Sequence, residues 1–158
     1  MLLPSNQTLL LLVLVLLLFW LLLRVQEPEA QRVQRTPLSP GELARMTFDA
    51  ARAADVRAWR ELFLRGEAAR AVLGEDAASW LAACTLEALT PDFQTLHRAL
   101  RPGVLFAGGR ADADGRCFLT VHTAAGATQE HAIGRFVKVG TALRLLEPPS
   151  GTFAIAAR

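Results

Sequence analysis

An uninterrupted run of fifteen apolar residues near the N-terminus constrains this chain more than any other feature. Residues 9–23 read LLLLVLVLLLFWLLL, and as a helix they would span roughly 22 Å of the ~30 Å hydrocarbon core. Thr8 and the aliphatic stem of Arg24, whose charge can reach the headgroups, extend this run. We therefore predict a transmembrane anchor over residues 1–24 that contacts lipid through Leu9, Val13, Leu16, Phe19, Trp20, Leu23 and Arg24.

A cleaved signal peptide is the competing interpretation, since its apolar region has a similar length. No Lys or Arg precedes Leu9, and the RVQEPEA segment after the run lacks a small-x-small cleavage site. These two features favour a retained anchor. Arg24, Arg32 and Arg35 all follow it, and the positive-inside rule then predicts a cytoplasmic position for the remaining chain. The abundance of Arg and Ala is typical of a GC-rich bacterial genome, so the expected membrane is the bacterial inner membrane.

Residues 25–38 hold Pro28 and Pro37 among polar residues, which predicts a semi-extended linker. Residues 39–158 are enough for one domain with its own core. Basic and acidic residues number 17 and 15, a balance that leaves no electrostatic footprint for nucleic acid. Cys84 and Cys117 fall in a predicted helix and a predicted strand, which favours two buried thiols. A single disulfide is the alternative, and it would imply an oxidising compartment.

Helix signals fill the first half of this domain. Ser39, Pro40 and Glu42 form an N-cap, first-turn proline and capping-box partner, with Leu43, Met46, Ala50 and Ala54 following at helical spacing. Asp55 can cap a second helix that carries Val56, Trp59, Leu62 and Phe63 on one face. Gly66 and Gly74 interrupt the next segment. Further helices are predicted from Asp76, with an apolar stripe of Ala77, Trp80, Leu81, Cys84 and Ala88, and from Thr90-Pro91-Asp92, with Phe93, Leu96 and Leu100 inward.

The hydrophobic period changes to two after Pro102-Gly103, which predicts strands. We expect strands at residues 104–106, 117–123, 133–139 and 143–146, with Asp112-Ala113-Asp114-Gly115 as a hairpin turn. Pro148-Pro149 ends the fourth strand, and residues 152–156 form a last edge strand or a tail. Helices followed by a meander of strands predict an α+β fold, with the helices packed on one face of an antiparallel sheet.

Three segments carry a resemblance to a known family. These are FDAARAADVRAWRELF (residues 48–63), GVLFAGGRADADGRCFLTV (103–121) and GRFVKVGTALRLLEP (134–148). Their order resembles the opening helix pair, central hairpin and closing strand pair of the nuclear transport factor 2-like superfamily, the ketosteroid isomerase-like cone. The likeness covers residues 43–147. Members often carry a Trp at the place taken here by Ala142 or Leu143.

The resemblance implies a curved sheet that encloses a pocket with the helices. Its members range from isomerases and cyclases to scaffolds without catalysis, so the fold alone does not decide the function. The inner-membrane scaffold subunits of type IV secretion systems, which have a similar layout, place their domain in the periplasm. That analogy opposes the cytoplasmic position that the charge rule predicts.

No complete catalytic set is recognisable in the sequence. An isomerase-like site needs a carboxylate base and a proton donor, often Tyr, but the chain has no Tyr, and Asp112 and Asp114 suit a turn. His122 and His131 could approach each other on adjacent strands, but no third metal ligand has a recognisable spacing. Gly108-Gly109 indicates a bulge or a bend in a long strand rather than a phosphate loop. We therefore expect no catalytic, cofactor-binding or metal-binding residues, and a pocket or partner surface that includes His97, His122, His131 and Arg135.

The leading hypothesis is a membrane-anchored, non-enzymatic accessory or scaffold subunit that contacts other subunits of a membrane complex. The alternative is a tethered pocket that binds or isomerises an apolar small molecule. A buried ionisable group in a concave, apolar cavity would favour the alternative. The arginines of the first helices form either a solvated face or a contact with anionic lipid headgroups.

Overall fold

The computed structural model describes residues 13–15, 36–100 and 102–150, and the chain divides into two compact units, Met1–Arg35 and Thr36–Arg158. In the first unit, Val13, Leu14 and Val15 are helical and exposed. The rest of the predicted anchor and most of the predicted linker lie outside the described residues. Within the described ranges, no helix combines the length and the apolar character needed to cross a membrane.

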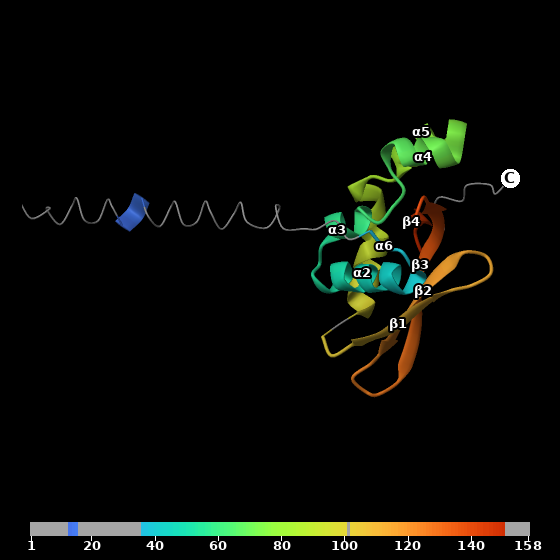
Figure 1. Cartoon of the computed structure of the whole chain (residues 1–158). Helices are drawn as coiled ribbons and strands as arrows, with labels where there is room; N and C mark the ends of the chain where they lie inside the picture. The colour runs from blue at the N-terminus through green and yellow to red at the C-terminus, as the bar shows by residue number, and fades with distance from the viewer. Residues whose placement is uncertain (1–12, 16–35, 101, 151–158) are drawn as a thin grey trace, which may run out of the picture. The chain divides into compact units, whose positions relative to one another are not determined.

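The described part of the second unit begins with helices and ends with strands, as the sequence predicts (Figure 1). The Ser39 hydroxyl accepts a hydrogen bond from the Glu42 amide at 3.2 Å, and Pro40 takes the first helical position. Asp55 caps the next helix by accepting from the Ala58 amide at 2.9 Å. The helices are α2 (Pro40–Arg52), α3 (Val56–Arg60), α4 (Gly66–Leu73), the 3-10 helix η1 (Gly74–Asp76), α5 (Ala77–Ala83) and α6 (Leu86–Ala99).

Two of the expected helix boundaries are wrong. The last helix starts at Leu86 instead of near Pro91, because Thr85 caps it by accepting from the Ala88 amide at 3.2 Å. Pro91 therefore lies inside α6, where its missing N–H removes one helical hydrogen bond. The preceding helix, α5, ends at Ala83, so the predicted apolar stripe from Ala77 to Ala88 belongs to two helices.

The four strands of the described residues form one antiparallel sheet in the order β1-β2-β3-β4. They are β1 (Leu105–Ala111), β2 (Arg116–His122), β3 (Thr128–Val139) and β4 (Ala142–Glu147). The predicted turn joins β1 to β2: Asp112 Oδ1 accepts from the amides of Asp114 and Arg116 at 3.0 and 2.8 Å. β3 begins five residues before the predicted start because its first half, TQEHA, is polar and gives no hydrophobic signal.

The core lies between the helices and one face of the sheet. Trp59 and Trp80, which the sequence pattern assigns to the apolar faces of two helices, are 0% and 3% exposed. The Trp59 ring meets Phe63 edge-on at 5.0 Å and Phe93 at 5.5 Å, and Trp80 Nε1 donates to the Leu64 carbonyl at 3.0 Å. Leu62 and Phe63 lie beyond the end of α3, not on it.

The outer edge of β4 is covered by other parts of the chain. The Leu143 amide donates to Pro37 O at 2.8 Å, so the end of the predicted linker packs on the domain. The Leu145 amide donates to Leu62 O at 2.8 Å, and the Leu64 amide donates to Leu145 O at 2.9 Å. β4 therefore offers little free backbone to a further strand.

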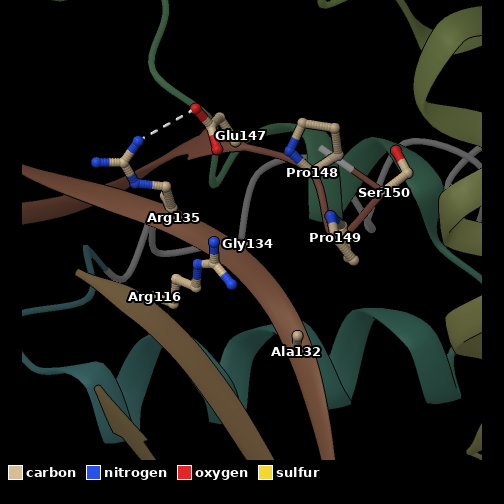
Figure 2. Close-up of a pocket in the computed structure, with 8 residues that line it drawn as sticks. All are labelled: Arg116, Ala132, Gly134, Arg135, Glu147, Pro148, Pro149 and Ser150. Carbon is tan, nitrogen blue, oxygen red and sulfur yellow. Dashed lines mark hydrogen bonds and ion pairs between the residues drawn. The ribbon is translucent and has the colours of Figure 1, made fainter. Parts of the chain in front are cut away.

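Two glycines allow close approaches in the sheet. A Cβ on Gly109 of β1 would lie 2.2 Å from Ala44 Cβ of α2, so only glycine permits this packing. The β1–β2 register shifts between Phe106 and Gly108, so the irregularity expected at Gly108-Gly109 comes just before these glycines, which pair regularly with Thr120 and Leu119. Gly134 of β3 has a φ of +126°, and its Cβ would lie 1.9 Å from Glu147 O. The register shifts on both sides of Gly134, and β3 bends there (Figure 2).

Candidate functional site

The two faces of the sheet carry different residues. Residues directly opposite each other in antiparallel strands share a face. Cys117, Leu119 and Val121 of β2 are fully buried and define the inner face, which the helices cover. The alternate residues Phe118 and Thr120 lie on the outer face. This alternation assigns each candidate residue to a face.

His122 and His131 lie on opposite faces, so the expectation that they approach each other is wrong. His131 is opposite Leu119 and therefore belongs to the inner face. His122 is opposite Thr128 on the outer face, with 3.1 Å between its Nδ1 and the Thr128 hydroxyl. His131 lies an odd number of positions along β3 from Thr128, the partner of His122, so the two histidines point to opposite faces. The sequence alone does not reveal this register.

His97 joins two helices. Its Nδ1 lies 2.7 Å from Ala51 O of α2, a contact that requires the proton on Nδ1. Its ring is stacked with that of Phe93, one turn earlier on α6, at 6.5 Å and 11°. These contacts give His97 a structural part in holding α6 against the end of α2.

An ion pair crosses the outer face above an aromatic ring. Arg110 Nε and Nη2 each donate to a different oxygen of Glu130 at 2.8 Å. The same guanidinium lies 4.5 Å from the centre of the Phe118 ring. These hydrogen bonds from Arg110 lower the pKa of the Glu130 carboxyl, and they raise that of Arg110. The pair therefore links side chains of β1 and β3 across the outer face, above Phe118 of β2.

A cavity of about 250 Å³ lies where β4 ends (Figure 2). Arg116 and Arg135 are directly opposite each other on β2 and β3, and both line this cavity with Gly134 and Ser150. Arg135 Nη1 is 3.4 Å from Glu147 Oε1, whose side chain is only 12% exposed. Arg116 has no carboxylate partner among the described residues. The described residues that line this cavity thus include two guanidinium groups and one carboxylate, which leaves an excess of positive charge there.

A second cavity, of about 440 Å³, lies between α6 and β3. Leu96 and Ala99 of α6 give it an apolar wall, and His131 lines it from β3. The Nε2 atom of His131 is buried and has no hydrogen-bond partner in the described structure. At the rim, the Ser150 hydroxyl donates to Asp92 Oδ2 at 2.7 Å.

The two cavities flank an open stretch of β3. β2 pairs with residues 128–135 of β3, whereas β4 pairs only with residues 135–139. In the described part of the chain, no strand lies on the second edge of residues 128–134. Pro148 and Pro149, which lack N–H groups, follow β4 at the point where further pairing would begin. We call this edge, with its two cavities, the β3 edge groove.

The two thiols are free and buried. Burial raises the pKa of Cys84 to about 11, although the nearby positive charges of Arg60 and Arg65 oppose the shift. Burial raises the pKa of Cys117 to about 11 as well. Both thiols are therefore protonated at neutral pH and are weak nucleophiles.

The structure brings only part of the predicted surface together. His131 and Arg135 line the two cavities of the β3 edge groove, whereas His97 and His122 lie elsewhere. Sequence reasoning missed Arg116, Asp92 and Ser150, since nothing in their local sequence indicates the register that places them there. Among the described residues, no three His, Cys, Asp or Glu side chains gather as a metal site would require.

Comparison of the chain with protein-family models, with curated proteins and with solved structures gave no match. The class that the structure defines is an α+β domain, with helices packed against a four-stranded antiparallel sheet.

Proposed function

We propose that this chain is a membrane-anchored, non-enzymatic accessory or scaffold subunit that acts through protein contacts in a membrane complex. The apolar run at residues 9–23 supports the anchor, and the open edge of β3 supports the contact surface. An anchor raises the effective concentration of the attached domain for a neighbouring membrane protein. The excess positive charge beside that edge favours a polar partner over an apolar small molecule.

For the fold, our proposal is the nuclear transport factor 2-like cone. The order of helices before a four-stranded meander and the bend of β3 at Gly134 support it. For the location, we propose the bacterial inner membrane. The arginines after the anchor favour a cytoplasmic domain, whereas the family analogy favours a periplasmic one.

Exchange of the anchor tests this function. The full-length protein is purified from native membranes, and its co-purifying proteins are identified by mass spectrometry. Because the proposed anchor also packs against partner helices, replacing residues 9–23 with an unrelated transmembrane helix should weaken or abolish their recovery. Replacing His97, His122 or Asp112 singly should leave it unchanged, since these residues lie outside the β3 edge groove. Unchanged recovery after the anchor exchange would contradict the proposal.

A tethered small-molecule pocket is the second candidate, and His131 is the observation that favours it. His131 lines a partly apolar cavity, and its buried Nε2 atom has no hydrogen-bond partner among the described residues. Loss of the biological phenotype in a His131→Ala variant that stays folded and retains its co-purifying proteins would reverse the ranking. A phenotype that persists in this variant would support the scaffold.

A further inference from the structure

The open edge of β3 is regular enough to accept another strand. Residues 128–132 pair with β2 without a bulge, and the register shift comes only after residue 132. These five residues give an edge about 17 Å long, at ~3.3 Å per residue. The outer edge of β1 also lacks a neighbour among the described strands, but a bulge between Phe106 and Gly108 interrupts it. A binding strand would therefore find its best template on β3.

The cavities lie where the side chains of an added strand would go. Successive side chains of a strand point to opposite faces of a sheet. The cavity with His131 and Leu96 is on the inner face, and the cavity with Arg116 and Arg135 is on the outer face. One side chain of an added strand would lie on the side of the partly apolar cavity, and its neighbour would lie on the face that carries the two guanidinium groups.

The charges indicate what the outer-face side chain should be. Like charges placed directly opposite each other destabilise a pair of strands. Arg116 and Arg135 are such a pair, and Glu147 is the one carboxylate among the described residues that line their cavity. Glu130, which lines the other cavity, is already paired with Arg110. A second carboxylate would neutralise the Arg116 guanidinium and could accept two hydrogen bonds from it.

We propose that the β3 edge groove binds an extended segment of a partner protein, which adds a strand to β3 and presents an acidic side chain to Arg116 and Arg135. This proposal rests on the scaffold function proposed above. It names the surface of the contact and the chemistry of the partner: an acidic residue next to an apolar or hydroxyl-bearing one, within a β-prone segment. Residues 151–158 of this chain, GTFAIAAR, contain no acidic side chain and so do not meet that requirement.

A pair of synthetic peptides tests the proposal. One alternates threonine and valine around a central aspartate, and the other has lysine in place of the aspartate; both are acetylated and amidated. They are titrated into the full-length protein in detergent micelles, and backbone amide signals are followed by NMR. The aspartate peptide should shift the amides of residues 128–132 saturably, and its dissociation constant should be at least about tenfold lower than that of the lysine peptide.

Charge reversal provides the matched variants. Arg116→Glu should reverse the preference, so that the lysine peptide binds more tightly. Arg70→Glu changes an exposed arginine on α4, away from the groove, and should leave the preference as it is. If Arg116→Glu does not fold, Arg116→Gln should still reduce the discrimination between the two peptides.

Three results would overturn the proposal. The first is the absence of saturable shifts at residues 128–132 with either peptide. The second is binding that occurs only in a variant ending at Ser150, which would identify residues 151–158 as the occupant of the edge. The third is shifts that follow protein concentration instead of peptide concentration, which would identify a second copy of the chain.

These results are distinct from a failure of the scaffold function. If the peptides do not bind but native proteins still co-purify with the wild type and with Arg116→Glu, only the proposed surface is wrong. If no protein co-purifies with the wild type, the scaffold function itself is wrong.

Discussion

Neighbouring residues along β2 have opposite surroundings. Leu119 is fully buried against the helices, whereas Thr120, the next residue, faces outward near Glu130 at 3.5 Å. The inner face holds the domain together through apolar contacts, and the outer face carries arginines and a carboxylate in water-accessible positions. Substitutions on the inner face should therefore change stability, whereas those on the outer face should change recognition. The following predictions test that difference.

The largest effect is expected on the inner face. Leu119→Ala should lower the free energy of unfolding by about 2–5 kcal/mol, because it leaves a cavity in a packed core. The matched change Thr120→Ala, one residue further along β2, should stay within about 0.5 kcal/mol of the wild type. Urea unfolding followed by tryptophan fluorescence measures both. Equal losses at the two positions would contradict the assignment of the faces.

The close approach of α2 to β1 should show the next largest effect. Gly109→Ala would place its Cβ against Ala44 Cβ at the 2.2 Å approach, so α2 must move, at a cost of roughly 1–3 kcal/mol. Gly108→Ala is the control, because a Cβ there meets nothing within 4 Å. The difference between the two melting temperatures reports the packing of α2 on the sheet. A larger loss in Gly108→Ala would indicate a different register at the bulge.

Some parts of this fold are predictable from local sequence, and others are not. The Asp112–Gly115 turn and the Ser39 cap are specified by residues four or fewer positions apart, and both form as predicted. The start of α6 was missed because Pro91 is a stronger local signal than the Thr85 cap, although the helix tolerates it. The polar first half of β3 was missed because its side chains give no hydrophobic alternation.

The β3 edge groove depends on long-range pairing. Pro148-Pro149 correctly predicts where β4 ends, but the sequence does not reveal that Glu147 is opposite Arg135. That register, and the bend that Gly134 allows, decide how much of β3 stays unpaired. The same register places Arg116 beside Arg135 although 19 residues separate them in the chain. Without that register, the candidates chosen from the sequence include His131 and Arg135 but not Arg116.

Alkaline pH should destabilise the core through its two buried thiols, Cys84 at the end of α5 and Cys117 on β2. The pKa of each buried cysteine is raised to about 11, against 9.0 for the ordinary thiol. The unfolded state therefore releases the thiol protons at a lower pH than the folded state does. The free energy of unfolding has its full value below pH 9.0 and should fall as the pH rises toward about 11. With no Tyr and one Lys in the chain, few other side chains titrate in this interval. A Cys84→Ala, Cys117→Ala double variant should show a flatter pH dependence in the same unfolding assay, and an unchanged slope would exclude the thiols as its cause.

The smallest effect on stability is expected from the Arg110–Glu130 pair on the outer face. Both side chains are about half exposed, 52% and 41%, so water and salt screen their attraction. Because Arg110 lowers the pKa of Glu130 in the folded state, the contribution of the pair to the free energy of unfolding is fully present above the pKa that Glu130 has in the unfolded chain. It is lost as the pH falls through the lower pKa that Glu130 has in the folded state.

A double-mutant cycle with Arg110→Gln and Glu130→Gln, measured at neutral and acidic pH and at low and high salt, separates the pair from its neighbours. Its coupling should be weaker than either inner-face effect, and it should decrease with salt and with acid. A coupling as large as the Leu119→Ala loss and insensitive to salt would mean that the outer face is shielded from water. In that case, the contrast between the two faces of β2 would not hold.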